Sequence, residues 1–413
     1  MTARGAAVAG ALAVGCGGGG GGGGEPIALG AITPLTGDLV MSGHNQQEAL
    51  LLAIDEINRA GGVLGRPLTL ETRDDATTGP GTAAAFAELF DQGVPVILGP
   101  IHSAGVLASV DAIRGGRTLT ISGGATSPAL ADIDDGGFFF RTVPSDAVQA
   151  IVLGPRIVSA GIDRLCIVHR NDAYGTGLST VIKARLPESV MVLESPYDPT
   201  TLDAAAVMDV CAPALEGTKP GAVFVTFEGD GQAILEQAAL QWDAARHGIF
   251  LVDGNRSANL FSALGARVAA FEGALGTAPS GPDPRSSAGP RLAAFLSRFN
   301  NKYRRPPSTN AENHYDAAYL AALAIELAGG ADSTEAIRDA VGSTGAGSAI
   351  GAGDWAALRA AVATQGQVDY QGASGELNFD IASGELLPPY YVQLWTIRDG
   401  QITDLEVLTV TER

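Results

Sequence analysis

Two short segments of the chain combine hydroxyl side chains with glycine where a predicted strand leads into a predicted helix. The apolar stretch 94–98 precedes the sequence GPIHSAG at 99–105, and the stretch 118–121 precedes SGGATSP at 122–128. In open parallel sheets, ligands bind beyond the carboxyl ends of the strands, where helix N-termini offer unpaired N–H groups and a positive dipole end. A carboxylate fits such a place.

Helix capping alone can also explain each of these junctions. In the second junction, Ser127 is a natural cap and Pro128 suits the first helical position. The two neighbouring junctions carry the same hydroxyl-plus-glycine chemistry, however, which favours ligand binding. Glycine at 123 and 124 lets a ligand approach the backbone, so Gly124 is a candidate together with the hydroxyl groups of Ser103 and Thr126.

Catalytic motifs are missing from the sequence or incomplete. The sequence IHSAG at 101–105 resembles a nucleophile elbow without its first glycine, and a histidine next to a serine rarely presents a base to it. No Walker-type loop occurs, and GAGSAI at 345–350 lacks the third glycine of a dinucleotide fingerprint. The histidines show no metal-ligand spacing: His44, His102, His169, His247 and His314. We therefore expect no catalysis, no cofactor and no metal.

Charge and length restrict the class of protein further. The chain has 413 residues and a formal net charge of −19. A nucleic-acid-binding face needs clustered lysine and arginine, so binding to nucleic acid is not expected. At roughly 100–200 residues per domain, two domains are the natural expectation.

The N-terminus indicates export. Arg4 precedes a short apolar run of small residues that ends in Gly15-Cys16, and eight glycines follow at 17–24. This pattern resembles a bacterial lipoprotein signal, in which the cysteine becomes the lipidated first residue. We predict a signal peptide at 1–15, and a lipidated Cys16 with a flexible glycine tether at 16–25. The alternative is an ordinary cleaved signal.

Two further cysteines remain, Cys166 in an apolar strand-like run and Cys211 in an alanine-rich helical stretch. Export permits a disulfide between them. Two buried thiols would serve equally well as small apolar side chains. The sequence leaves both possibilities open, and we favour free thiols.

The hydrophobic pattern predicts strands that alternate with helices, which is typical of a doubly wound α/β fold. The first half has predicted strands at 27–32, 68–72, 94–98 and 118–121 and helices at 42–60, 81–91 and 103–114. After a pause at 138–144, the second half has strands at 164–169, 190–193, 222–226 and 249–252 and helices at 147–160, 176–186, 201–215 and 232–245. A loop at 276–290, helices at 291–303 and 312–328, a mobile stretch at 342–353 and a hairpin of 390–395 with 401–410 complete the chain.

Six segments together resemble one family, the type I periplasmic binding proteins that bind branched-chain amino acids and amides for ABC importers. They are ITPLTG at 32–37, DEINRAGGV at 55–63, RDD at 73–75, ISGGATSP at 121–128, YG at 174–175 and NFD at 378–380. The resemblance implies two Rossmann-like doubly wound lobes joined by a three-strand hinge, with crossovers near 143–145, 275–278 and 375–383. Lobe 1 is then 26–143 and 278–375, and lobe 2 is 144–277 and 376–413.

The resemblance also implies a binding site divided between the lobes. In lobe 1, the positions of Ser103, Ala125 and Thr126 hold the carboxylate and amine of an amino acid. Many relatives carry a large aromatic residue after the first-strand turn, whereas this chain has Ser42 after Met41. The side-chain specificity of relatives therefore does not carry over.

In lobe 2, the position of Tyr174 covers the ligand, and the position of Asp253 pairs with the ammonium group. Phe227 and Glu228, at the end of strand 222–226, are expected to line the cleft. The plainer alternatives are that Tyr174 is a packing residue and that Asp253 only forms a turn.

The expected function is capture of a small amino acid or amino-acid-like ligand and its delivery to the permease subunits of an ABC importer. The alternative is a ligand sensor of the same fold that signals to a partner protein. We expect a monomer, anchored by its lipid on the outer face of the cytoplasmic membrane or in the periplasm.

Overall fold

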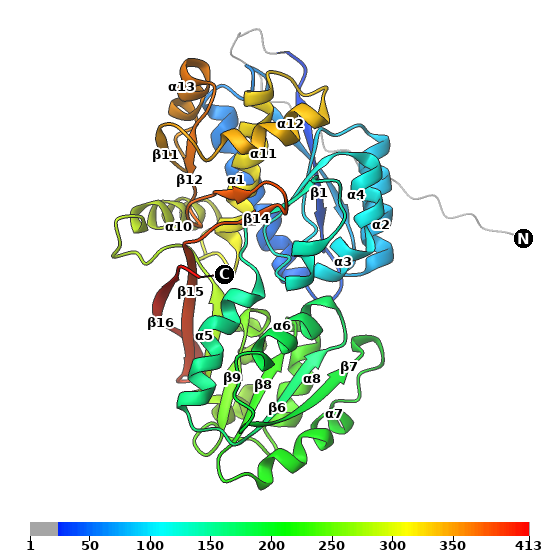
Figure 1. Cartoon of the computed structure of the whole chain (residues 1–413), viewed down its shortest axis with the longest axis vertical. Helices are drawn as coiled ribbons and strands as arrows, with labels where there is room; N and C mark the ends of the chain where they lie inside the picture. Colours follow the sequence, from blue (N-terminus) through cyan, green and yellow to red (C-terminus); the bar gives the residue numbers. More distant parts are fainter. Residues whose placement is uncertain (1–23, 413) are drawn as a thin grey trace, which may run out of the picture.

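The apolar strands of the chain form two separate sheets, and each sheet builds one lobe of the molecule. The structure is a computed structural model that describes residues 24–412, and Figure 1 shows the two lobes one above the other. The predicted signal peptide, Cys16 and most of the glycine tether lie outside the described residues. Among residues 24–412, no helix has the length and apolar character needed to cross a membrane.

The first lobe contains a five-stranded parallel sheet in the order β2-β1-β3-β4-β5. Its strands are β1 (Ile27–Thr33), β2 (Leu68–Asp74), β3 (Val96–Leu98), β4 (Leu119–Ser122) and β5 (Phe139–Arg141). The helices that connect them are α1 (Val40–Arg59), α2 (Gly79–Asp91), α3 (Ser103–Ala108) and α4 (Val110–Gly116). The strand order reverses beside β1, and ligands bind at such switch points.

The second lobe contains a seven-stranded sheet in the order β16-β15-β10-β9-β8-β6-β7. The parallel strands are β6 (Arg164–Arg170), β7 (Met191–Tyr197), β8 (Pro220–Val225), β9 (Gly248–Leu251) and β10 (Leu275–Pro279), and the antiparallel hairpin is β15 (Tyr390–Arg398) with β16 (Gln401–Val410). Its helices are α5 (Asp146–Ser159), α6 (Ala173–Lys183), α7 (Ala204–Cys211), α8 (Glu228–Ala238) and α9 (Ala258–Ala263). The order β7-β6-β8-β9-β10 repeats that of the first sheet, and the predicted pair of doubly wound lobes is confirmed.

The chain passes between the sheets three times. It leaves the first sheet after β5 and enters α5, it returns after β10, and it enters β15 after the short hairpin of β13 (Phe379–Asp380) and β14 (Glu385–Leu386). The second and third crossings touch, since the backbone N–H of Ser280 donates to the carbonyl of Tyr391 at 3.1 Å. The exact residue boundaries of the lobes stay a prediction.

The helices after the second crossing return to the first lobe. They are α10 (Gly289–Tyr303), α11 (Ala311–Ala328), α12 (Thr334–Ala340) and α13 (Trp355–Gln365). Most of α11 is buried, including each of its first fifteen residues. A helix that is apolar on every side belongs in a core, and α11 packs in the same apolar cluster as α1 and the first sheet. The stretch 342–353, predicted to be mobile, contains β11 (Ala349–Gly351), which pairs with β12 (Asp369–Gln371).

Three predicted elements differ from the structure. The helix predicted at 103–114 is two helices that meet at Ser109, and the helix predicted at 201–215 is the short α7 between two 3-10 turns that contain Pro199 and Pro213. The predicted loop at 276–290 starts inside β10. There Gly276 lies so close to the Trp395 ring that a Cβ atom would stand 2.1 Å from it. Glycine therefore allows this strand to pack under an indole, although it usually marks a loop.

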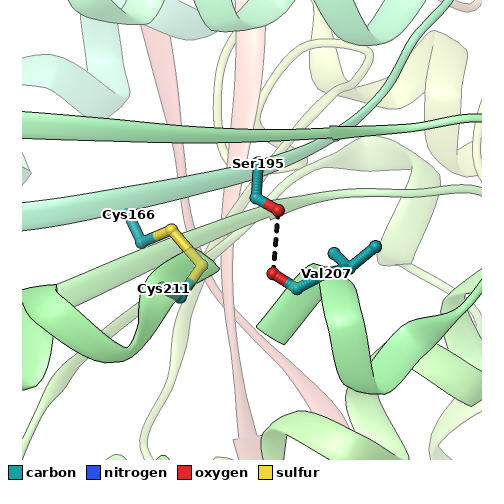
Figure 2. The surroundings of a disulfide bond; sticks show 4 residues. All are labelled: Cys166, Ser195, Val207 and Cys211. Atoms are coloured by element: carbon teal, nitrogen blue, oxygen red, sulfur yellow. Dashed lines mark hydrogen bonds between the residues drawn. A yellow bond between two sulfur atoms is a disulfide. The ribbon is translucent and has the colours of Figure 1, made fainter. Parts of the chain in front are cut away.

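The preference for free thiols was wrong. Cys166 in β6 and Cys211 at the end of α7 form a disulfide, with their Cα atoms 5.4 Å apart (Figure 2). Both residues are buried, and beside them the Ser195 hydroxyl of β7 donates to the carbonyl of Val207 in α7 at 2.8 Å. The strand and helix patterns of the sequence do not show which face of α7 meets β6, so the pairing could not be derived from them.

This disulfide should stabilise the second lobe by restricting the unfolded chain. It closes a loop between residues separated by 45 positions, for which the chain-entropy estimate is about 4 kcal/mol and typical measured values are about 2–4 kcal/mol. We expect the double variant Cys166→Ala/Cys211→Ala to lose free energy of unfolding in that range in a denaturant titration. The wild-type protein with reductant is the matched control and should lose a similar amount. Two reactive thiols in the unreduced, denatured wild type would contradict the disulfide.

Candidate ligand-binding site

A cleft of about 450 Å³ lies between the two lobes, at the carboxyl ends of the parallel strands. The first lobe lines it with residues that follow β1, β3 and β4, and the second lobe lines it with residues that follow β6, β8 and β9. The cleft therefore occupies the place where this fold class binds ligands. Of the predicted site residues, the cleft brings together Ser103, Gly124, Thr126, Tyr174, Phe227, Glu228 and Asp253.

The wall of the first lobe is built on the two predicted junctions. Ser103 begins α3, and its hydroxyl oxygen accepts a hydrogen bond from the backbone N–H of Ser127 at 3.0 Å. The hydroxyl proton of Ser103 is thereby left to donate into the cleft. Ser122 shapes the second junction, since its hydroxyl oxygen accepts from the N–H groups of Gly124 at 3.3 Å and Ala125 at 3.0 Å.

Ala125 is the one predicted site residue that does not line the cleft. It is fully buried, its N–H is bonded to Ser122, and its carbonyl oxygen accepts from Arg141 at 3.1 Å. The same guanidinium donates to the carbonyl of Ser127 at 2.9 Å and forms a bidentate pair with Glu385 at 2.7 and 2.6 Å. Ala125 therefore helps to hold the turn in place and does not face the cleft.

The wall of the second lobe is aromatic and acidic. The Tyr174 hydroxyl donates to a carboxylate oxygen of Asp253 at 2.7 Å and accepts from the N–H of Gly254 at 3.2 Å. The Tyr174 ring stacks on Phe227 with centroids 5.0 Å apart, and the Arg170 guanidinium lies 4.1 Å from the centroid of the Phe227 ring. Stacking and the cation–π contact hold both rings in place. Tyr174 is therefore both a packing residue and a cleft residue.

Asp253 supplies a carboxyl group at the base of the cleft. Poor solvation raises its pKa, and hydrogen bonds from Tyr174 and Gln149 partly oppose that rise. Asp253 also starts the 3-10 turn Asp253–Asn255. It is therefore a turn residue, as the alternative interpretation expected, as well as a cleft residue. A cationic ligand group that approached Asp253 would favour the ionised carboxylate.

A second carboxyl group, that of Asp146, lies behind the first. Asp146 begins α5 and is fully buried, and its carboxylate accepts from the Gln149 side chain at 2.7 Å. Burial and then the charge of Asp253 raise its pKa well above the usual range. The Gln149 carbonyl in turn accepts from the Thr277 hydroxyl of β10 at 3.2 Å. The site is thus linked to the first two crossings by side-chain hydrogen bonds.

Comparison with known proteins identifies the family. Residues 26–401 match the sequence profile of the family described as periplasmic binding protein. The chain belongs to this family. Its relatives and fold neighbours include type I binding proteins of the branched-chain amino acid group.

Three similar proteins illustrate the group. The chemotactic signal transduction system substrate-binding protein BasB of Halobacterium salinarum is 27% identical over 403 residues, 93% of this chain and 90% of its own. A leucine-, isoleucine-, valine-, threonine- and alanine-binding protein of Pseudomonas aeruginosa is 28% identical, over 75% of this chain and 80% of its own. The crystal structure of the branched-chain amino acid transporter substrate-binding protein LivJ from Streptococcus pneumoniae with isoleucine has a TM-score of 0.75 at 20% identity, covering 93% of this chain and all (100%) of that one.

This periplasmic binding protein thus belongs to a family that binds small molecules and is exported, and the family is one of binding proteins rather than enzymes. The one histidine beside Ser103 is used in the fold. The Nδ1 atom of His102 accepts from the N–H of Gly105 at 3.1 Å, and Nε2 lies 3.2 Å from a carboxylate oxygen of Asp75. Both ring nitrogens are therefore engaged away from the serine.

The two lobes of the binding protein contact each other. The Arg170 guanidinium of lobe 2 pairs with the carboxylate of Asp38 in lobe 1 at 3.0 Å. The Ser127 hydroxyl donates to the carbonyl of Ala173 at 2.7 Å, across the same interface. The two lobes are therefore joined by direct side-chain contacts as well as by the three crossings.

Several cleft residues were not predicted from the sequence. They follow β1 and β9 or lie in and before α11: Met41, Ser42, Gly254, Arg256, Arg305 and His314. Ser42 was noted only as the residue that replaces an aromatic ring. His314 falls in the helix that was predicted as a core element, and only the polar pair Asn313-His314 at its start marked it in the sequence.

The buried Asp146 carboxyl should make stability depend on pH. Its folded-state pKa lies above the ordinary value of 3.8. Between these two values the folded protein keeps a proton that the unfolded chain has released, so the free energy of unfolding falls as pH rises through that interval.

We expect Asp146→Asn to remove this part of the pH dependence. Because an asparagine amide cannot ionise, the variant avoids the cost of ionising a buried carboxyl beside Asp253 and should be more stable than the wild type at neutral pH. Denaturant titrations measure the free energy of unfolding of both proteins between about pH 5 and about pH 8, which is the range where stability usually peaks. Asp332→Asn on the surface is the control. A variant that is less stable at neutral pH and keeps the wild-type slope would contradict the assignment.

Proposed function

We propose that this protein captures a small zwitterionic amino acid, or a close analogue, between its lobes and delivers it to an ABC importer. The observation that carries the proposal is the chemical difference between the two walls of one cleft. The first lobe presents the hydroxyl groups of Ser103, at the start of α3, and of Thr126, just before the 3-10 turn Pro128–Asp132, and the second presents the carboxyl group of Asp253. A carboxylate suits the first wall and an ammonium group suits the second.

The other proposed contacts shape the rest of the ligand site. The Gly124 backbone borders the carboxylate position, whereas Tyr174 and Phe227 form a flat apolar wall. Glu228 begins α8, and its carboxylate accepts from the Ser257 hydroxyl at 2.8 Å. A ligand held by both walls favours closure, because only contacts that differ between the open and closed forms shift that equilibrium.

The proposal includes the place of action. A signal peptide at 1–15, a lipidated Cys16 and a glycine tether at 16–25 would hold a monomeric binding protein at the membrane, on the outer face of the cytoplasmic membrane or in the periplasm. Such a tether lets the folded lobes meet the permease subunits.

Sensing is the second candidate function. The similarity to a chemotactic substrate-binding protein of Halobacterium salinarum extends over 93% of this chain, so the same cleft could serve a signalling partner. Deletion of the gene separates the two. Loss of ligand uptake supports transport, and loss of the behavioural response with uptake intact supports sensing.

We expect small amino acids with modest apolar side chains to stabilise the protein against heat. A ligand that binds only the folded state stabilises it by about 2.7 kcal/mol at 100 times its dissociation constant. A thermal-shift screen of amino acids, sugars and aromatic acids measures this. A shift with sugars or aromatic acids and none with any amino acid would refute the proposed ligand class.

Variants of the two walls test the same prediction. Thr126→Ala and Asp253→Asn should each weaken amino-acid binding roughly ten- to a hundredfold, the cost of a hydrogen bond to a charged group. Titration calorimetry measures the affinity, and the surface substitutions Thr201→Ala and Asp332→Asn are the matched controls. If Asp253→Asn binds as tightly as wild type, the ammonium group is held elsewhere.

Export and lipidation predict where the protein is found in the cell. The mature protein should sediment with membranes, and Cys16→Ser should move it to the soluble fraction because the lipid supplies the anchor. Mass spectrometry of the N-terminus provides the control. Unprocessed Met1 in cytoplasmic protein would exclude both export and lipidation.

A further inference from the structure

His314 is a polar side chain in the cleft that has no hydrogen-bond partner among residues 24–412. It lies in the first turn of α11, its residue is only 3% exposed, and it lines the cleft between the lobes. Within residues 24–412, its imidazole nitrogens make no hydrogen bond, although buried polar groups are normally satisfied. A partner supplied by a ligand would complete the site.

The imidazole is packed onto the turn that forms the first wall. A Cβ atom at Gly123 would stand 2.4 Å from the Nδ1 atom of His314, and one at Gly124 would stand 3.4 Å from its Cε1 atom. Gly123 is therefore required for the close approach of the ring. The space above this glycine, expected from the sequence to admit a ligand, is taken by His314, and the ring lies next to Gly124 at the edge of the cleft.

The chemistry of the ring at this position is that of a neutral donor. Burial lowers the pKa of His314 to about 3, so the imidazole is uncharged near neutral pH. A neutral imidazole has one N–H donor and one acceptor. The N-terminus of α11 also faces the cleft through Asn310, whose side chain makes no capping bond. The positive end of the helix dipole favours an anion there, and one acidic group, the buried Glu312 carboxyl, already bonds its own backbone N–H in the first turn.

We propose that His314 contacts the bound ligand and donates its N–H group to the ligand carboxylate. This inference rests on the proposed function, because it makes α11 a third source of contacts for the same site. The ammonium group is left to Asp253 on the opposite lobe, so the histidine serves as a donor rather than as an acceptor. The carboxylate is then held by Ser103, Thr126 and His314.

The test uses three small-molecule probes that share the isoleucine side chain. They are L-isoleucine, its amide, which lacks the carboxylate, and 3-methylpentanoate, which lacks the ammonium group. In the full-length protein, His314→Ala should weaken isoleucine binding about tenfold or more, the loss of one hydrogen bond to a charged group. His314→Gln, which keeps an N–H donor, should recover part of the lost isoleucine affinity. The amide should bind weakly and equally to all forms, and surface His44→Ala should bind as wild type does.

A second measurement does not depend on the stability of the variants. Nitrogen NMR of the histidine side chains, with the His314 signals assigned by their loss in His314→Gln, should show a shift of one ring nitrogen when isoleucine is added. Unchanged His314 signals, or an unchanged isoleucine affinity in His314→Ala, would overturn the proposal. If 3-methylpentanoate binds in a manner that requires His314 and isoleucine does not bind, the zwitterion proposal fails and the His314 assignment stands. Binding of none of the carboxylates would overturn both.

Discussion

The binding site depends on one buried cation, the guanidinium of Arg141. It is fully buried at the end of β5, where it holds two carbonyl oxygens of the 122–128 turn and pairs with Glu385. Removal of either partner of such a pair leaves an uncompensated buried charge, which typically costs about 3–5 kcal/mol. Because Arg141 precedes the first crossing and Glu385 precedes the third, one ion pair fixes both the ligand-facing turn and two strands of the hinge.

The same turn meets the second lobe. The carbonyl of Thr126 accepts from the N–H of Asp146 at 2.8 Å, and the Ser127 hydroxyl bonds the carbonyl of Ala173, the residue before Tyr174. The turn that would hold the carboxylate therefore also positions the start of α5 and of α6. A shift of the turn is transmitted through packed, hydrogen-bonded groups rather than absorbed locally. This arrangement links ligand contacts to the relative position of the lobes.

The sequence indicated part of the cleft lining because strand ends and helix starts are local features. Ser103, Thr126, Tyr174 and Asp253 each follow a predicted strand, and parallel pairing brings these ends to one edge of each sheet. His314 was missed because its place depends on how α11 packs against the first sheet. Asp146 was missed because its neighbours come from three separate elements, and the pairing of Cys166 with Cys211 failed for the same reason. Local sequence patterns do not predict how distant elements pack against each other.

The acidic end of the cleft explains why a ligand rather than the protein itself would stabilise the closed form. Asp253 and the fully buried Asp146 behind it share a poorly solvated space, and the charge of Asp253 raises the pKa of Asp146. Opening lets water solvate Asp253, whereas an ammonium group neutralises it without opening. The Asp38–Arg170 contact joins a buried guanidinium, 5% exposed, to an Asp38 side chain that is 38% exposed, so solvent weakens its contribution. The ammonium group of the proposed ligand would therefore contribute a contact to Asp253 that differs between the open and closed forms, which is the kind of contact that shifts such an equilibrium.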